Sequence, residues 1–312
     1  MSQHPEDQDT PAQGYAKKDE HKKRDRKDRR KALVASMMMA IFGRLPIAIN
    51  RIIGGMIGRL TWYFGSQAAQ SSLKNIQDCF PDLDETRQRT LAKASIICTA
   101  KTALEVTYVW SQPYKKIKHL ISGNQQFTGI QGKLDQGVGV LLLVPHLGNW
   151  EILSSVLPQC FDFTAMYQPT GIEKIDAFMI AGRTREGCKL APTNRKGVSH
   201  VLKQLHAAKI VAILPDQVPD ESGGELSPFF GKPALTMTLV HKLVQRTQCQ
   251  VLMLFAKQVK SGFEMIIREP DPNIYDTDQA KSLAAMNRSV ESCVLEAPEQ
   301  YQWEYKRFKR AD

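Results

Sequence analysis

The second half of the chain alternates short, fully apolar runs with longer stretches of helical character. The clearest apolar run spans residues 138–144, and further runs follow at 161–167, 210–214 and 251–259. Runs this short and this apolar are typical of strands that are buried on both faces. Strands that alternate with helices form a mostly parallel sheet with helices packed on its faces. The sequence therefore predicts an α/β fold with a mostly parallel central sheet flanked by helices.

The segments between these runs have helical periodicity or long stretches without glycine and proline. We expect one further strand at 263–268 and helices within 66–125, from 149 onward, and at 176–186, 196–209, 236–247 and 278–296. Together with the strands, these helices predict a folded α/β domain over residues 65–312.

Residues 1–31 are polar and highly charged. Ten basic and four acidic side chains lie between Lys17 and Lys31, and a segment with so few apolar groups cannot offset the entropy that ordering it would cost. We therefore expect a disordered basic tail. A plain solvated tail has this composition, and so does an electrostatic arm for anionic lipid headgroups, where each basic residue is worth about 1 kcal/mol. The apolar segment that follows favours the second interpretation.

Residues 32–64 are rich in Leu, Ile and Met but contain Arg44, Arg51 and Arg59. A membrane-spanning helix needs roughly 18 or more apolar residues without charge, and this segment does not provide them. The arginines recur at intervals of seven or eight residues, so they can share one helical face and extend to the lipid headgroups. We expect a membrane-anchoring helix in the bilayer interface. An amphipathic helix packed on the protein's own core, or a short span, would give a similar pattern.

Three of the predicted strands are followed directly by polar residues. His146 follows the first strand, Gln168 the second and Asp216 the third. Ligands of open α/β sheets bind just beyond the carboxyl ends of the strands. If the three strands are neighbours, these side chains converge on one edge of the sheet.

His146 and Glu151 form a plausible catalytic pair. A neutral histidine can take the proton of a hydroxyl that attacks an acyl group, and a carboxylate beside it can orient the ring and stabilise the imidazolium. The intervening segment contains Gly148, which permits a close backbone approach, so we expect Glu151 to fold back to the ring. A structural or capping histidine after a strand would give the same local sequence.

Five segments, in order along the chain, resemble the bacterial lipid A late acyltransferases, a branch of the lysophospholipid acyltransferase superfamily. They are NIQDCFPDLD at 75–84, PHLGNWE at 145–151, ILPDQVPDESGG at 213–224, SPFFGKPALT at 227–236 and PEQYQWEYKRFK at 298–309. Several motifs in the same order are far more specific than any one of them. The resemblance identifies residues 65–312 as an acyltransferase domain.

The resemblance implies an O-acyltransferase that moves a fatty acyl chain from acyl carrier protein to a hydroxyl of a lipid A precursor, which is the secondary acylation of lipopolysaccharide synthesis. It implies His146 as the general base and Glu151 as its orienting partner, with no metal, no cofactor and no covalent enzyme intermediate. It also implies an enzyme at the inner membrane, with its active site facing the cytoplasm.

Further substrate-binding residues follow from the same resemblance. Arg183 and Arg185 match an arginine-bearing helix of the family, Arg195 begins a similar RKGV-like segment, and Asp216 matches a buried acid beside the site. Guanidinium groups bind phosphates and carboxylates in bidentate fashion, although surface arginines and a capping aspartate would need no such role. Gln168 stands where the family commonly has arginine, so the way in which the acceptor is held can differ here.

Other functions are compatible with parts of this pattern. An acyltransferase of the same superfamily could act on a lysophospholipid or an amino-acid lipid, but the glycerolipid branch usually has aspartate at the position of Glu151 and an EGTR-type block, which this chain lacks. A non-enzymatic basic protein would bind a membrane surface or nucleic acid through its charge of +10. We expect no nucleic-acid partner, because the basic tail lacks interleaved aromatic residues and no recognition motif follows it.

The six cysteines lack the spacing of a zinc site or of a redox-active pair. We expect free thiols in a reducing compartment. The first residues, SQHPEDQDTPAQG, lack the short basic region and apolar stretch of a signal peptide. We therefore expect the protein in the cytoplasm or on a membrane face in contact with it.

Overall fold

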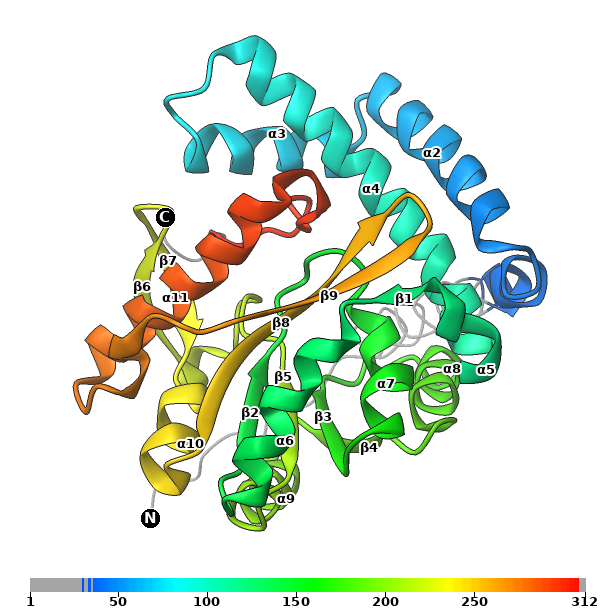
Figure 1. Ribbon diagram of the computed structural model, residues 1–312. Helices are drawn as coiled ribbons and strands as arrows, with labels where there is room; N and C mark the ends of the chain where they lie inside the picture. Colours follow the sequence, from blue (N-terminus) through cyan, green and yellow to red (C-terminus); the bar gives the residue numbers. More distant parts are fainter. Residues whose placement is uncertain (1–29, 31–32, 35, 309–312) are drawn as a thin grey trace, which may run out of the picture.

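A seven-stranded sheet forms the centre of the computed structural model, which describes residues 30, 33–34 and 36–308 (Figure 1). The strand order is β1 (Ile121–Ser122), β9 (Gly262–Arg268), β8 (Gln250–Val259), β2 (Val140–Leu143), β5 (Ile210–Ile213), β3 (Phe163–Tyr167) and β4 (Lys189–Pro192). The five strands from β8 to β4 in this order are parallel. β9 is antiparallel to β8, and β1 pairs with β9 in parallel. The predicted α/β class with a mostly parallel central sheet is confirmed.

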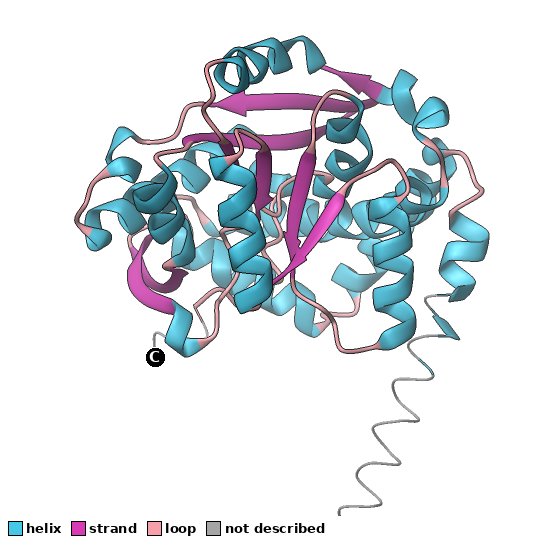
Figure 2. Cartoon of the chain, turned by 90° about the horizontal axis from the view of Figure 1, so that it is seen from below, coloured by secondary structure: helices cyan, strands magenta, loops and turns pink. Residues whose placement is uncertain are grey.

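Helices pack on both faces of the sheet (Figure 2). In chain order, the α-helices from residue 47 onward are α2 (Ile47–Tyr63), which packs on α4, then α3 (Gln67–Cys79), α4 (Glu85–Ser111), α5 (Tyr114–Ile117), α6 (Phe127–Asp135), α7 (Leu153–Val156), α8 (Glu173–Thr184), α9 (Arg195–His206), α10 (Leu239–Thr247) and α11 (Gln279–Glu296).

The alternation of side chains along each strand divides the core into two clusters. In β2, Leu141 and Leu143 pack with α9, α10 and α11 on one face, whereas Val140 and Leu142 pack with α6 and α7 on the other. All four residues of β2 are buried, which explains why this strand reads as a continuous apolar run.

A two-stranded hairpin was not expected from the sequence. It consists of β6 (Gly224–Phe229) and β7 (Lys232–Met237), and Phe229 pairs with Lys232, so the turn has two residues. Those residues, Phe230 and Gly231, both have positive φ, as a tight hairpin turn requires. Because β7 extends to Met237, the helix expected at 236–247 begins only at residue 239, in α10.

The helix α2 lies directly on α4. A Cβ atom added to Gly54 would be 2.7 Å from the Cα of Lys101, and one added to Gly58 would be 2.6 Å from the Cα of Ile97, so the two backbones meet through glycines. Within the described residues, no helix is long and apolar enough to cross a membrane. The basic tail predicted for residues 1–31 lies outside the described residues, apart from Arg30.

The orientation of Arg51 differs from the prediction that the arginines of this segment share a face directed at lipid headgroups. Its side chain is largely buried and points inward, where Nε lies 2.5 Å from Oε1 of Glu105. The guanidinium also donates to the carbonyl oxygens of Val259, Lys260 and Gly262 in the β8–β9 hairpin. A buried carboxylate and three backbone acceptors attract the guanidinium into the protein, and a spacing pattern alone does not reveal them.

Candidate active site

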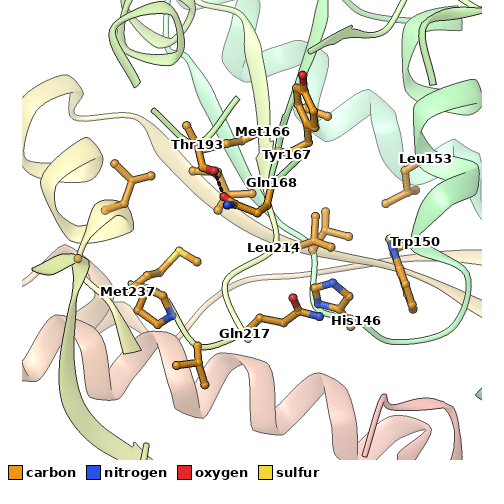
Figure 3. Close-up of a pocket in the computed structure, with 18 of the residues that line it drawn as sticks. His146, Trp150, Leu153, Met166, Tyr167, Gln168, Thr193, Leu214, Gln217 and Met237 are labelled. Carbon is orange, nitrogen blue, oxygen red and sulfur yellow. Dashed lines mark hydrogen bonds between the residues drawn. The ribbon is translucent and has the colours of Figure 1, made fainter. Parts of the chain in front are cut away.

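A cavity of about 610 Å³ opens at the carboxyl ends of β2, β5 and β3. Figure 3 shows the imidazole of His146 at this cavity, beside Trp150, with Gln217 next to it. The three strands are neighbours in the sheet, so the predicted convergence of polar residues at one edge is confirmed. The lining is mostly apolar and includes Val144, Leu153, Phe163, Ala165, Met166, Ala212, Ile213, Leu214, Val218, Met237 and Leu239.

A buried carboxylate holds the ring of His146. Oδ1 of Asp216 lies 2.8 Å from Nδ1 of the ring, and Oδ2 accepts the backbone N–H of the same histidine at 2.8 Å. The register explains this geometry: Leu143 of β2 pairs with Ile213 of β5, and each of the two polar residues follows its strand partner by three positions. When Nδ1–H donates to the carboxylate, Nε2 is left as the proton-accepting nitrogen of the ring.

The electrostatics favour an ionised Asp216. Burial alone would raise the pKa of this carboxyl group, but the charge of His146 and the hydrogen bonds from its ring and backbone outweigh burial and hold the pKa below its usual value. The carboxylate can therefore stabilise positive charge on the imidazole when the ring takes up a proton.

Glu151 has different partners from those predicted. Its Oε1 accepts from Arg183 at 2.5 Å and from the indole of Trp150 at 3.1 Å, and its Oε2 accepts from Arg183 at 2.8 Å and from the indole of Trp110 at 2.9 Å. The expectation that Glu151 folds back to the ring of His146 is therefore corrected: the ring contacts Asp216, and four donors from other residues occupy the Glu151 carboxylate.

Glu151 is nevertheless part of the same site. The carboxylate lines the cavity together with Arg183. Burial opposes its ionisation, but the charge of Arg183 and the hydrogen bonds from Arg183, Trp110 and Trp150 lower the pKa below its usual value. The indole of Trp150, whose N–H it accepts, packs edge-on against the imidazole of His146 with 4.8 Å between ring centroids. Glu151 thus contacts the histidine through Trp150.

The loop from His146 to Glu151 is fixed by close backbone contacts. Gly148 has φ +65°, and a Cβ atom added there would lie 2.0 Å from the carbonyl oxygen of Ala256 in β8. Its N–H donates to Gln300, and the next N–H, of Asn149, donates to Ala256. The expected close approach at this glycine is confirmed, and it joins the loop to the edge of β8.

The remaining predicted site residues lie at different depths. Arg183 lines the cavity, and its guanidinium is paired with Glu151. Gln168 is exposed at the cavity wall and accepts a hydrogen bond from Thr193. Arg185, at the end of α8, and Arg195, at the start of α9, are exposed and do not line the cavity.

Two tryptophans of the site were not identified from the sequence. Trp150 lies inside the motif that carries His146 and Glu151, so its position was a usable signal. Trp110 lies at the end of α4 and reaches Glu151 across 41 residues of sequence, and nothing in its local sequence indicates that contact.

Nearby thiols are poor candidates for a nucleophile. Burial raises the pKa of Cys188 to about 12, and a protonated thiol is a weak nucleophile. All six cysteines are free. Among the described residues, no group of three or more His, Cys, Asp and Glu side chains could hold a metal ion. The chemistry that this site offers is proton transfer by an oriented imidazole at the wall of an apolar cavity.

Comparison with known proteins identifies a family that this chain resembles over most of its length. The family model described as bacterial lipid A biosynthesis acyltransferase matches residues 20–310. The chain is 24% identical over 271 residues to a lipid A biosynthesis lauroyltransferase of Escherichia coli, covering 85% of this chain and 87% of the relative. It is 23% identical over 270 residues to a lipid A biosynthesis palmitoleoyltransferase of the same organism, with the same coverage. It is 27% identical over 267 residues to a lipid A biosynthesis acyltransferase of Haemophilus influenzae, covering 81% of this chain and 80% of the relative.

Proposed function

Since the chain belongs to the bacterial lipid A biosynthesis acyltransferase family, we propose that it transfers a fatty acyl chain from acyl carrier protein to a hydroxyl of a lipid A precursor. The observation that carries this proposal is the bond between Asp216 and Nδ1 of His146 at the wall of an apolar cavity. It leaves one imidazole nitrogen available to a hydroxyl and provides an apolar space for a fatty chain.

The proposed reaction is a direct transfer. Nε2 of His146 takes the proton of the acceptor hydroxyl while its oxygen attacks the thioester carbonyl carbon. A C–O bond forms and the C–S bond breaks, and the proton then passes from the imidazolium to the leaving thiolate. Asp216 stabilises the imidazolium between these two proton transfers. Glu151 acts on His146 indirectly, because it fixes Trp150 against the imidazole ring and pairs with Arg183 at the cavity wall.

The part of the cavity that is lined by apolar residues of β3 and β5 suits the fatty acyl chain. Ala165 of β3 and Ala212 of β5 are paired in register and both line the cavity. Two small side chains in adjacent strands leave a trough in the face of the sheet. Phe163 lies two residues further from the cavity mouth along β3 and is nearly fully buried, so we propose that its ring forms the floor. Burying each methylene there contributes about 0.8 kcal/mol.

Exposed arginines outside the cavity are suited to the anionic parts of the substrates. Arg185 and Arg195 are exposed and lie outside the cavity lining, so we assign them to acceptor phosphates or to the acidic carrier protein rather than to the fatty chain. Gln168 at the cavity wall offers an amide where the related proteins commonly have a positive charge. It is the feature that favours the second candidate function, acylation of another lipid such as a lysophospholipid or an amino-acid lipid.

The exposed apolar surface of the N-terminal region supports binding to the cytoplasmic face of the inner membrane. Large apolar side chains are exposed along α2 and the residues before it, and Tyr63 and Phe64 at its end are 80% and 76% exposed. Contiguous exposed apolar surface of this kind marks an interaction site, and a helix with such a face lies in the membrane interface. The exposed set is Leu33, Val34, Met37, Ile41, Ile49, Ile52, Met56, Ile57, Leu60, Tyr63 and Phe64.

The test is acyl transfer by the purified protein in detergent. Lauroyl-, myristoyl- and palmitoyl-carrier protein are supplied with either a Kdo-bearing tetra-acylated lipid A precursor or lysophosphatidic acid, and His146→Ala is run in parallel. We expect transfer to the lipid A precursor that is lost in the variant. Transfer to lysophosphatidic acid alone would establish the second candidate function, and wild-type turnover by a folded His146→Ala protein would contradict the assigned base.

A further inference from the structure

The loop that carries His146 and Glu151 has a further buried side-chain anchor, in addition to its backbone contacts and to the contacts of His146 and Glu151 themselves. Asn149 is fully buried, and its Nδ2 donates to Oε2 of Glu105 at 3.1 Å. Its Oδ1 is buried without a hydrogen-bond partner among the described residues. The contact with Glu105 is therefore what orients this side chain, three residues after the proposed base.

Glu105 is itself fully buried in α4. Its carboxylate receives three donors: Nε of Arg51 at 2.5 Å, Nε2 of Gln258 at 2.9 Å and Nδ2 of Asn149 at 3.1 Å. The donors come from α2, from β8 and from the loop. One carboxylate thus joins three parts of the chain that are far apart in sequence.

Stability alone does not explain why a charged carboxylate is buried at Glu105. Buried ion pairs are often no more stabilising than well-packed apolar side chains of the same volume, because both charges lose their hydration. A carboxylate that accepts from three directions does something that an apolar side chain cannot: it fixes the orientation of each donor. At Glu105 the oriented group that lies nearest to the chemistry is the amide of Asn149.

Arg51, another hydrogen-bond donor to the Glu105 carboxylate, lies on α2, the helix with the exposed apolar face. Arg51 continues from Glu105 to the carbonyl oxygens of the β8–β9 hairpin, while Ile52 and Met56 on the same helix are exposed. A displacement of α2 would therefore move Arg51, and with it the carboxylate that holds the loop.

We propose that Glu105 is a positioning residue for acyl transfer, and that it couples the placement of α2 to the geometry of the His146 loop. The inference rests on the proposed function. Through Asn149 the carboxylate holds the loop so that Nε2 of His146 meets the acceptor hydroxyl, and through Arg51 it makes that geometry depend on α2. Glu105 does not line the cavity proposed for the donor chain, so the effect falls on the catalytic step.

The first experiment compares Glu105→Gln, Asn149→Ala and the double variant with the wild-type full chain. We expect kcat to fall by about 10- to 100-fold in each single variant, with the KM for acyl carrier protein unchanged, because a displacement of about 1 Å at the base has a cost of that order. The double variant is expected to lose no more than the worse single variant, since both changes remove the same link. Additive losses, or wild-type kcat in folded variants, would overturn the proposal.

Asn287→Ala is the matched control. Asn287 is equally buried and donates to Pro228 and Thr236, away from the loop. Its loss is expected to lower the melting temperature while kcat stays at the wild-type value. If Glu105→Gln does not fold, the kcat of Asn149→Ala against that of Asn287→Ala decides the question, and equal kcat values would overturn the proposal.

A second measurement separates this inference from the proposed function. Amide hydrogen exchange of the peptide that covers residues 145–151 reports on the loop whether or not the protein turns over an acyl donor. We expect faster exchange of this peptide in Glu105→Gln and in Arg51→Gln, and unchanged exchange in Asn287→Ala. Inactive wild-type protein would contradict the function alone, whereas unchanged loop exchange in both Glu105→Gln and Arg51→Gln would contradict the coupling.

Discussion

Asp216 binds His146 twice, because its two carboxylate oxygens accept the ring Nδ1–H and the backbone N–H of the same residue at 2.8 Å each. The double contact fixes the position of the backbone and the tautomer of the ring together. The carboxylate that serves the histidine therefore comes from the neighbouring strand, whereas the glutamate five residues along the chain binds an arginine and two tryptophans.

Replacing Asp216 by Asn is expected to reduce kcat by a factor on the order of 10³ to 10⁴, because an amide in this place favours the tautomer with its proton on Nε2 and cannot stabilise the imidazolium. Steady-state acyl transfer checks this. Glu151→Gln, measured in parallel on folded protein, is expected to lose less, since its carboxylate does not touch the ring. A larger loss in Glu151→Gln than in Asp216→Asn would contradict the assignment of Asp216.

Acid is expected to weaken the Glu151–Arg183 pair in a defined direction. The folded-state pKa of Glu151 is lowered, since the effects of Arg183 and its hydrogen bonds outweigh burial, so the pair contributes stability above the unfolded-state pKa of about 4.3 and loses it as the pH falls through the folded-state value. At pH 7 we expect Glu151→Gln to lower the free energy of unfolding by about 3 kcal/mol, because Arg183 remains buried without its counter-charge.

Denaturant unfolding of both proteins between pH 3 and 7 measures this difference. It should shrink as the pH falls below about 4.3. A difference that stays constant over this range would show that the carboxylate charge does not stabilise the fold.

Ala212→Leu is expected to shift the acyl-chain preference toward shorter donors. The larger side chain enters the trough between β5 and β3 and removes space from the distal end of a fatty chain. A donor that loses contact for its last two methylenes loses about 1.6 kcal/mol, which exceeds tenfold in kcat/KM. Competition between lauroyl- and palmitoyl-carrier protein measures the shift.

Phe163→Ala serves as the opposite change, because it lowers the floor of the trough and is expected to favour the longer donor. Identical shifts in the two variants, or no shift in either, would place the fatty chain elsewhere in the cavity.

Membrane binding is expected to depend on the outer face of α2. Ile52→Glu should weaken co-sedimentation with anionic lipid vesicles about tenfold or more, because one exposed isoleucine is worth roughly 1.5 to 3 kcal/mol when it enters an apolar phase. Leu226→Glu on the β6–β7 hairpin is the matched control, since Leu226 is 59% exposed and Ile52 is 63% exposed. Equal binding by the two variants would remove α2 from the membrane-binding surface.

The order of most strands and helices in the second half of the chain could be predicted, because parallel strands that are buried on both faces consist of short apolar runs. The convergence of His146, Gln168 and Asp216 followed from the same rule about strand ends. β4 was missed because only Ala191 is buried in it, and β6 was missed because its residues alternate between exposed and buried and include Pro228.

The partner of each carboxylate could not be predicted, because hydrogen-bond partners depend on tertiary contacts that local spacing does not reveal. Glu151 lies five residues from His146, yet its strongest partner is Arg183 on α8. Arg51 shares a periodic pattern with Arg44 and Arg59, yet it alone of the three meets the buried Glu105.

The glycine contacts between α2 and α4 have a geometric consequence. With Gly54 and Gly58 against the backbone of α4, neither helix can roll about its axis without a steric clash, so the exposed side chains of α2 keep a constant direction relative to the cavity mouth. Any flat surface that binds those side chains is presented to His146 at a single tilt and height. A substrate held in such a surface would reach the imidazole only if its hydroxyl lies at the matching depth, and we propose that the helix pair acts as a spacer that selects among acceptor positions.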